Sequence, residues 1–242
     1  MAATIKICTV NIEGNKHLAD VEAFLQAEKP DVICLQEVFA ADIPRLQEKT
    51  GCTVHFTPMV TVLKENKYNI PAAGLWGVAI LTPHKHSLVQ SSFYRGEEGT
   101  VPEFTEPNSP NRVVLTTTIH KDGANFRVAT THFTWSGGGL ATEEQRQDAR
   151  RFRAIVDQFE DVIFCGDFNA PRGGEIHKMI GTGFADAVPS EVTTTIDPTR
   201  HYAGALELVV DGIFYSDEYA LHDCRVHAGV SDHQAIVAEF SK

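Results

Sequence analysis

The chain has 242 residues, a formal net charge of -11 and 43% hydrophobic residues, values that exclude a disordered or fibrous protein. The acidic excess argues against a protein that coats duplex DNA, because non-specific affinity for DNA comes from Lys and Arg side chains that displace counterions. No apolar run reaches the roughly 18 residues that a membrane helix needs, and residues 1–10 are too mixed for a signal peptide. We therefore expect neither a membrane span nor a leader.

Short apolar, β-branched runs recur along the chain, and each is typical of a strand. They cover residues 5–10, 32–35, 78–81, 113–119, 126–131, 162–165, 208–215 and 235–240. Between the fourth and fifth runs stands Asp122-Gly123, a strong signal for a tight hairpin turn. Residues 94–111 combine four glutamates with three prolines, which predicts a long loop of the kind that is often functional or mobile.

Two segments show helical periodicity. In the first, Leu18, Val21 and Leu25 repeat at helical spacing, and Pro30 ends the helix. The second begins at Thr142, whose side chain is a good N-cap with Gln145 three residues later. Its apolar stripe consists of Ala149, Phe152, Val156 and Phe159.

The opposite face of this second helix is polar, and it carries Arg146, Asp148, Arg150 and Arg151. A solvated surface is the simplest interpretation, and a nucleic-acid contact by the arginines is the alternative. Many strands with few helices favour an α/β fold in which two mainly antiparallel sheets pack together and helices cover their outer faces.

The five cysteines form an odd set without CxxC spacing, and three of them lie inside apolar runs. We expect small buried hydrophobic side chains in a reducing compartment. Together with the absence of a leader, this predicts a cytoplasmic protein.

Polar residues that bind metals or phosphates follow several of the strand-like runs. They are Asn11, Glu37, His132, Asp167, Asn169, Asp211, Asp232 and His233. Carboxylate and amide oxygens are hard ligands suited to Mg²⁺ or Mn²⁺, and such ions commonly assist phosphate chemistry. Each residue alone is a weak signal, whereas their joint position at strand ends predicts one metal-dependent phosphate site.

These elements resemble the endonuclease/exonuclease/phosphatase superfamily, the metal-dependent phosphoesterases that include DNase I-like nucleases. The matching motifs span residues 9–233. They are Thr9-Val10-Asn11, Leu35-Gln36-Glu37-Val38, Gly77-Val78-Ala79-Ile80-Leu81, Thr131-His132, Gly166-Asp167-Phe168-Asn169, Val210-Asp211-Gly212-Ile213-Phe214 and Ser231-Asp232-His233. The resemblance implies a four-layer α/β/β/α sandwich, one catalytic domain over residues 1–242, and a site at one end of the two sheets.

The resemblance also implies roles for the site residues. Glu37 would be the main ligand of Mg²⁺ or Mn²⁺, with Asn11 and Asp232 beside it. His233, oriented by Asp211, would contact the scissile phosphate or help to activate the attacking water.

Three further residues would handle the phosphate itself. Asp167 would act on the water or the leaving group. Asn169 would bond the phosphate or orient that chemistry, and His132 would stabilise the phosphate.

The flanking loops carry the candidate substrate contacts. Trp135, before three glycines, either stacks on a base or packs beneath its loop. Arg200, His201 and Tyr202 either bind a phosphate or base or form an ordinary polar turn. Arg112 precedes a strand and would support the floor of the site.

The predicted activity is hydrolysis of a phosphodiester in a nucleic-acid end, a nucleotide or a small molecule, by a monomer without stable membrane association. A tyrosyl-DNA phosphodiesterase is a second hypothesis, although Phe168 stands where that branch usually has Thr. A sphingomyelinase-like lipid phosphodiesterase is a third hypothesis, and an inactive binding scaffold is a fourth.

Overall fold

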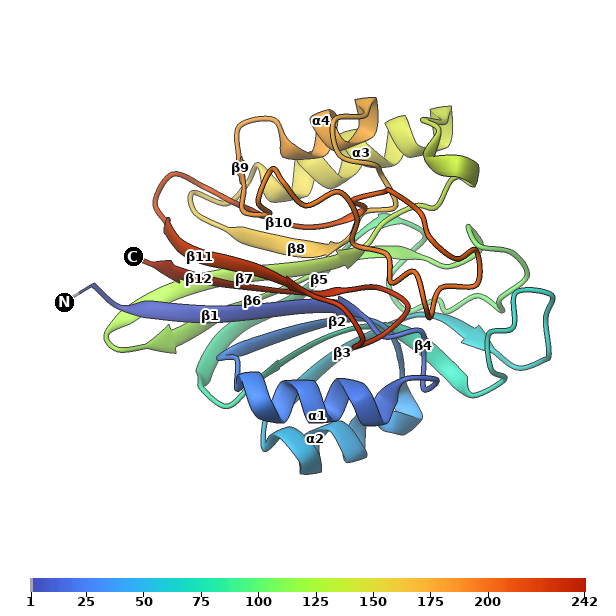
Figure 1. Cartoon of the computed structure of the whole chain (residues 1–242), viewed down its shortest axis with the longest axis horizontal. Coiled ribbons are helices and arrows are strands. Elements are labelled where there is room, and N and C mark those ends of the chain that lie inside the picture. Colours follow the sequence, from blue (N-terminus) through green and yellow to red (C-terminus); the bar gives the residue numbers. More distant parts are fainter. Residues whose placement is uncertain (1) are drawn as a thin grey trace.

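The computed structural model describes residues 2–242 as two six-stranded sheets that pack face to face, with a pair of helices on each outer face (Figure 1). The sequence of layers is helices, sheet, sheet, helices. The predicted α/β/β/α sandwich is therefore confirmed. Each sheet contains one parallel pair of strands, β1 with β2 and β7 with β8, and the remaining pairs are antiparallel.

We call the first sheet sheet A. From edge to edge it contains β11 (Ala220–His227), β12 (Ala235–Ser241), β1 (Thr4–Asn11), β2 (Val32–Phe39), β4 (Gly74–Thr82) and β3 (Thr53–Val62). Its outer face is covered by α1 (Leu18–Glu28) and α2 (Ile43–Thr50), which a short 3-10 turn (Ala40–Asp42) precedes. The first and last strands of the chain thus lie side by side near the centre of sheet A.

Sheet B is built from the middle of the chain. It contains β5 (Lys85–Arg95), β6 (Arg112–Lys121), β7 (Ala124–His132), β8 (Ile163–Asp167), β10 (Asp211–Tyr215) and β9 (Ala185–Asp186). Its outer face is covered by α3 (Glu143–Val156) and α4 (Glu175–Gly181), and a 3-10 turn (Gly137–Gly139) precedes α3. An aromatic core that includes Phe152, Phe164, Phe168 and Phe214 fills this layer.

Most predicted strands lie within the observed ones, and the hairpin turn has the predicted geometry, with positive φ at both Asp122 and Gly123. Two runs begin too early: 162–165 starts one residue before β8, and 208–215 starts three residues before β10, which begins at Asp211. The preceding residues bond to loops instead of extending the ladder: Phe168 N–H donates to the Val210 carbonyl, and Arg172 N–H donates to the Val209 carbonyl.

Both predicted helices are present, and the second differs in detail from its prediction. Thr142 caps α3, and its hydroxyl accepts a hydrogen bond from the Gln145 backbone N–H. The helix ends at Val156, so Phe159 lies beyond it under the Arg127 guanidinium. The expectation of a wholly solvated polar face is wrong for Asp148. That carboxylate is buried and accepts a hydrogen bond from the Thr134 hydroxyl.

The acidic segment after β5 is tied to the edge of sheet A. Thr61 N–H donates to the Pro102 carbonyl, Phe104 N–H donates to the Thr61 carbonyl, and Asn111 N–H donates to the Met59 carbonyl. The segment therefore lies along β3. Among residues 2–242, no helix is long and apolar enough to cross a membrane. All five cysteines have free thiols, and four of them are buried.

Candidate active site

The two sheets bring the polar strand ends together at one end of the sandwich, which we call the site end. In sheet B, His132 is the register partner of Asp167, and Asp167 is the register partner of Asp211. In sheet A, Asn11 is the register partner of Gln36, next to Glu37. The predicted catalytic and metal residues thereby lie at neighbouring strand ends or in the segment just before β12.

Glu37 owes its direction to an irregularity in β2. The register between β2 and β4 shifts between Leu35 and Val38, and Glu37 has a φ of 62°. This bulge re-aims a side chain that would otherwise alternate with its neighbours. The Glu37 carboxylate accepts a hydrogen bond of 3.1 Å from the Asn11 amide, and the same amide nitrogen lies 3.1 Å from an Asp167 oxygen. Asn11 therefore links carboxylates from the two sheets.

Asp167 depends on the unusual backbone on both sides of it. At Gly166 the φ is 143°, and a Cβ atom there would lie 2.0 Å from the Thr131 carbonyl oxygen. After Asp167 the chain turns through Asn169, whose φ is 49° and whose N–H donates to the Asp167 carboxylate over 2.8 Å. The Asn169 side-chain amide donates to the Phe133 carbonyl over 3.0 Å. Asn169 thus fixes Asp167 and keeps a second amide hydrogen for a ligand.

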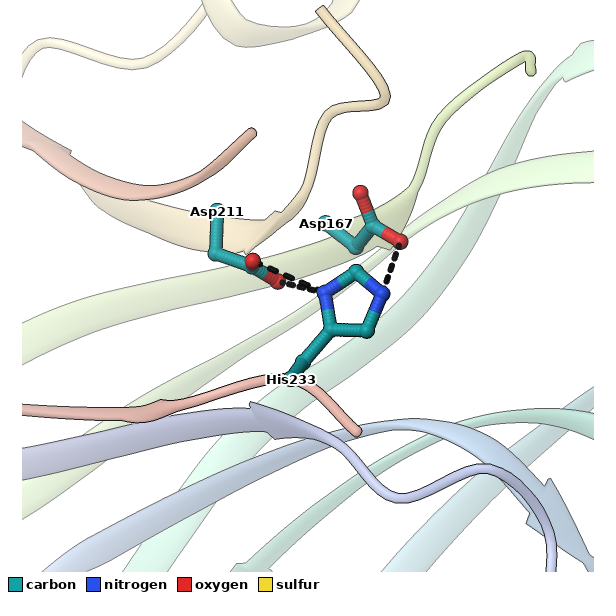
Figure 2. Close-up of side chains that lie close together, drawn as sticks. All are labelled: Asp167, Asp211 and His233. Atoms are coloured by element: carbon teal, nitrogen blue, oxygen red, sulfur yellow. Dashed lines mark hydrogen bonds and ion pairs between the residues drawn. The ribbon is translucent and has the colours of Figure 1, made fainter. Parts of the chain in front are cut away.

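His233 and Asp211 form a buried pair that points at Asp167 (Figure 2). The His233 Nδ1 atom lies 2.8 and 3.1 Å from the two Asp211 oxygens, and Nε2 lies 3.9 Å from an Asp167 oxygen. Burial by itself lowers the pKa of His233, but the charges of Asp211 and Asp167 outweigh it and hold the pKa well above its usual value. These two carboxylates therefore favour the protonated form of the ring.

His132 has the opposite character. Its Nε2 atom lies 3.5 Å from an Asp167 oxygen and 3.8 Å from a Glu37 oxygen. Burial dominates here and lowers the pKa of His132 to about 3. Arg112 lies beneath it, fully buried, and donates to the His132 carbonyl over 3.1 Å. Arg112 therefore supports the floor of the site, and its buried guanidinium does not face solvent.

The carboxylates at the site end outnumber their cationic partners. Burial and then the charge of Asp232 raise the pKa of Glu37 to about 8. Oxygen atoms of Asp167 and Asp211 and a nitrogen of His233 lie within 4.8 Å of one another, although Asp211 is already engaged by His233. A half-buried carboxylate next to a second one is a donor set that suits a hard divalent cation.

Three of the predicted substrate residues, Trp135, Arg200 and Tyr202, lie outside the buried catalytic group. Trp135 is 42% exposed. Its backbone is held by the Asn108 side-chain amide, which donates to the Trp135 carbonyl and accepts from the Trp135 N–H. Arg200 pairs with Asp20 over 2.7 Å, and Tyr202 is 87% exposed. Within residues 2–242, these three side chains form no hydrogen bond with the buried group.

Sequence patterns assign no role to several residues that shape the site. The Thr195 hydroxyl, fully buried, accepts from the backbone N–H of Val210 and Asp211, and the Thr195 carbonyl accepts from Gln234 N–H. It therefore holds the segments that carry Asp211 and His233 together. A hydroxyl within a run of three threonines gives no signal of that position.

Two rings also approach the buried histidines. Trp76 packs edge-on against His132, with ring centroids 6.0 Å apart. His201 lies 6.3 Å from His233, and its Nδ1 accepts from Ala203 N–H over 3.2 Å. The Arg200-His201-Tyr202 loop thus reaches the site through its histidine.

Comparison with known proteins identifies the family to which this geometry belongs. The model of the Endonuclease/Exonuclease/phosphatase family matches residues 8–233. No curated protein matches the sequence significantly. Three similar solved structures have low identity, so they show the shared fold alone.

The first is an endonuclease/exonuclease/phosphatase from Beutenbergia cavernae, with 17% identity, a TM-score of 0.74, and coverage of 99% of this chain and 72% of that one. The second is a family protein from Leptotrichia buccalis, with 18% identity, a TM-score of 0.74, and coverage of 98% and 100%. The third is the human Nocturnin catalytic domain with bound sulfate, with 21% identity, a TM-score of 0.69, and coverage of 100% and 95%. The chain belongs to the endonuclease/exonuclease/phosphatase family.

Proposed function

We propose that this protein is a phosphoesterase that depends on Mg²⁺ or Mn²⁺ and hydrolyses a phosphodiester by attack of water. One observation carries the proposal. The Nε2 atoms of His132 and His233 both approach one oxygen of the Asp167 carboxylate, at 3.5 and 3.9 Å, while the pKa of His132 is lowered by burial and that of His233 is raised by Asp211 and Asp167. A base, a hydrogen-bonding ring and a positive charge thus converge on one small volume.

Glu37, Asn11 and Asp232 would hold the cation. The donor chemistry fits, because Glu37 and Asp232 offer carboxylate oxygens, and burial lowers the pKa of the His132 ring that lies within ion-pair distance of Glu37. Asn11, whose amide nitrogen now faces Glu37, would turn its amide to offer its oxygen. When bound, a divalent cation supplies positive charge that offsets the charge developing on the phosphate oxygens.

The protein's own groups would perform the proton transfers and the positioning. The Asp167 carboxylate is held by donors from Asn11 and Asn169, so it is oriented to accept a proton from the attacking water. Protonated His233 would donate to a phosphate oxygen, with Asp211 fixing its ring. The second amide hydrogen of Asn169 and the His132 ring would bind the remaining oxygens.

The rim of the site supports a substrate with an aromatic or charged group beyond the phosphate. Trp135 and Tyr202 are exposed aromatic rings, and base stacking on such rings is sequence-tolerant. We therefore propose a nucleic-acid end, a nucleotide or a small phosphodiester as substrate, Arg200 as a phosphate contact, and action as a cytoplasmic monomer without stable membrane association.

A substrate panel tests the proposal. It contains abasic duplex, a 5′-tyrosyl oligonucleotide, single-stranded DNA, sphingomyelin vesicles and bis-p-nitrophenyl phosphate, each with Mg²⁺, Mn²⁺ or EDTA. We expect metal-dependent turnover that EDTA and Glu37→Ala abolish while the variant keeps its fold. Turnover confined to the tyrosyl oligonucleotide or to sphingomyelin would assign one of those narrower activities. Inactivity on every substrate, or full activity of Glu37→Ala, would overturn the proposal.

A further inference from the structure

A pair of histidines joins the two sheets along an edge of the sandwich. β3 is an edge strand of sheet A, and β5 is an edge strand of sheet B. Across this edge the Nε2 atoms of His55 and His86 lie 2.7 Å apart, and the hydroxyls of Thr57 and Ser91 also lie 2.7 Å apart. The side chains of the two edge strands therefore face each other directly.

The hydrogen-bond partners define the protonation of this pair. The His86 Nδ1 atom lies 3.0 Å from the His84 carbonyl oxygen, which can only accept, so His86 carries its proton on Nδ1. Its Nε2 atom therefore presents a lone pair, and His55 supplies the proton between the rings. The rings are inclined by 70° with centroids 4.5 Å apart, so the two Nε2 atoms converge.

We propose that His55 and His86 bind a late first-row divalent metal ion, for which Zn²⁺ is the probe. Imidazole nitrogen is a preferred ligand of such ions. His55 would move its proton from Nε2 to Nδ1, so that both Nε2 lone pairs face the ion without net loss of a proton. Tetrahedral Zn–N bonds of about 2.05 Å separate the nitrogens by about 3.4 Å, so the two Nε2 atoms would move apart by about 0.7 Å.

The surroundings of the pair match those of a metal ligand set. A metal-binding histidine usually donates its other ring N–H to a carbonyl or carboxylate, as His86 does to the His84 carbonyl. The His84 ring in turn lies 2.7 Å from an Asp31 oxygen, which anchors the loop that presents this carbonyl. Both His55 and His86 are half-buried, so water can complete the coordination.

The histidine pair is separate from the catalytic group. His55 is the register partner of Ile80, whereas at the site end Phe39 is the register partner of Trp76. Four residues along β4 span about 13 Å. A metal that links β3 to β5 would stabilise the folded state, because the unfolded chain does not hold the two imidazoles together.

Calorimetric titration of Zn²⁺ into the whole protein, with excess Mg²⁺ present, tests the proposal. The variants are His55→Gln, His86→Gln and the matched control His120→Gln, whose ring nitrogens bond Ser87 and Asn125 instead. We expect each of the first two to weaken Zn²⁺ binding at least about tenfold, as loss of metal partners does, and to remove the rise in Tm that Zn²⁺ causes. The control should behave as wild type.

Unchanged affinity in His55→Gln and His86→Gln, or loss of the Zn²⁺ binding only in Glu37→Gln, would overturn the proposal. A second measurement needs no variant. Imidazole nitrogen resonances of wild-type protein should shift for His55 and His86 on Zn²⁺ addition, and shifts confined to different histidines would contradict the assignment.

Discussion

Two half-buried carboxyl groups at opposite ends of the sandwich have pKa values that are shifted in opposite directions. At the end away from the site, Asp31 accepts hydrogen bonds from the Lys121 ammonium and the Lys6 backbone amide and contacts His84. Burial alone would raise its pKa, but these donors outweigh burial and hold the pKa below its usual value. At the site end, burial and the neighbouring Asp232 raise the pKa of Glu37.

The difference shows that partners, more than burial, decide the state of a carboxylate in this protein. The end with Asp31 is neutralised internally, as expected where charge serves stability. The site end leaves Glu37 and Asp232 without such compensation, and it also holds positive φ values at Glu37 and Asn169. Positive φ values and a strongly raised carboxyl pKa that occur together at one place indicate function.

The largest expected effect comes from adding one methyl group to the backbone at the site end. Gly166→Ala would place a Cβ 2.0 Å from the Thr131 carbonyl at a φ of 143°, forcing β7 and β8 apart. We expect destabilisation of about 3 kcal/mol or more and loss of activity, measured by urea unfolding and turnover.

Gly123→Ala is the matched control at the opposite end. It has a φ of 83° but no atom within 4 Å of the added Cβ. It should cost about 1–2 kcal/mol and leave activity intact. Equal losses of stability and activity in Gly166→Ala and Gly123→Ala would contradict the special role of the backbone at the site end.

The second prediction compares the loss of a carboxylate at the site end, Asp211, with the loss of Asp31 at the opposite end. Asp211→Asn should lower kcat/KM by about 10²–10⁴-fold, because neutral Asn no longer holds the pKa of His233 high. The alkaline limb of the pH–rate profile should then move to lower pH. Asp31→Asn should leave both kcat/KM and the profile unchanged. A profile that does not move in Asp211→Asn would contradict the assignment of His233 as the protonated group.

The third effect concerns the rim of the site end. Trp135→Ala and Tyr202→Ala should each raise KM for a nucleic-acid substrate about tenfold, as loss of base stacking does, with little change in kcat. KM for bis-p-nitrophenyl phosphate should not change. Leu140→Ala, which removes an exposed side chain five residues after Trp135, is the control. Equal losses on both substrates would show that the rings pack against the protein instead of the base.

The smallest effect is the pH dependence of stability at the end with Asp31. Because the folded-state pKa lies below 3.8, the usual value for aspartate, the contribution of Asp31 is complete above that value and is lost as the pH falls through the folded-state pKa. Wild type should exceed Asp31→Asn in unfolding free energy by about 1 kcal/mol or less at pH 6. This difference in unfolding free energy should disappear as the pH falls through the folded-state pKa of Asp31. A difference that does not change with pH would contradict the ion pair.

The central strands could be predicted from sequence because they are continuous apolar runs buried on both faces. None of the four edge strands matches a predicted run. β3, β5 and β11 have half-exposed residues that mix polar and apolar types without clear alternation, and β9 has only two residues. β3 even contains Pro58, which an edge strand tolerates at its register shift. α2 was missed because Leu46 is its sole buried residue.

At the site, strand-end position and family resemblance identified the chemical groups, whereas their states depend on three-dimensional surroundings. The local sequence around His132 and His233 does not show that burial lowers the pKa of the first ring while Asp211 raises the pKa of the second. Likewise, Asp148 looks like a surface residue of a helix until Thr134 is seen to donate to it. Long-range contacts of this kind leave no local pattern.

The strand order of sheet A has a consequence for synthesis of the protein on the ribosome. Among the strands of residues 2–242, β1 is translated first, yet one of its two neighbours is β12, which is translated after all the others. Asp232 and His233 lie just ahead of β12. A nascent chain can therefore pair β1 with β2 early, but sheet A and the catalytic group are completed together, once β12 has left the ribosome.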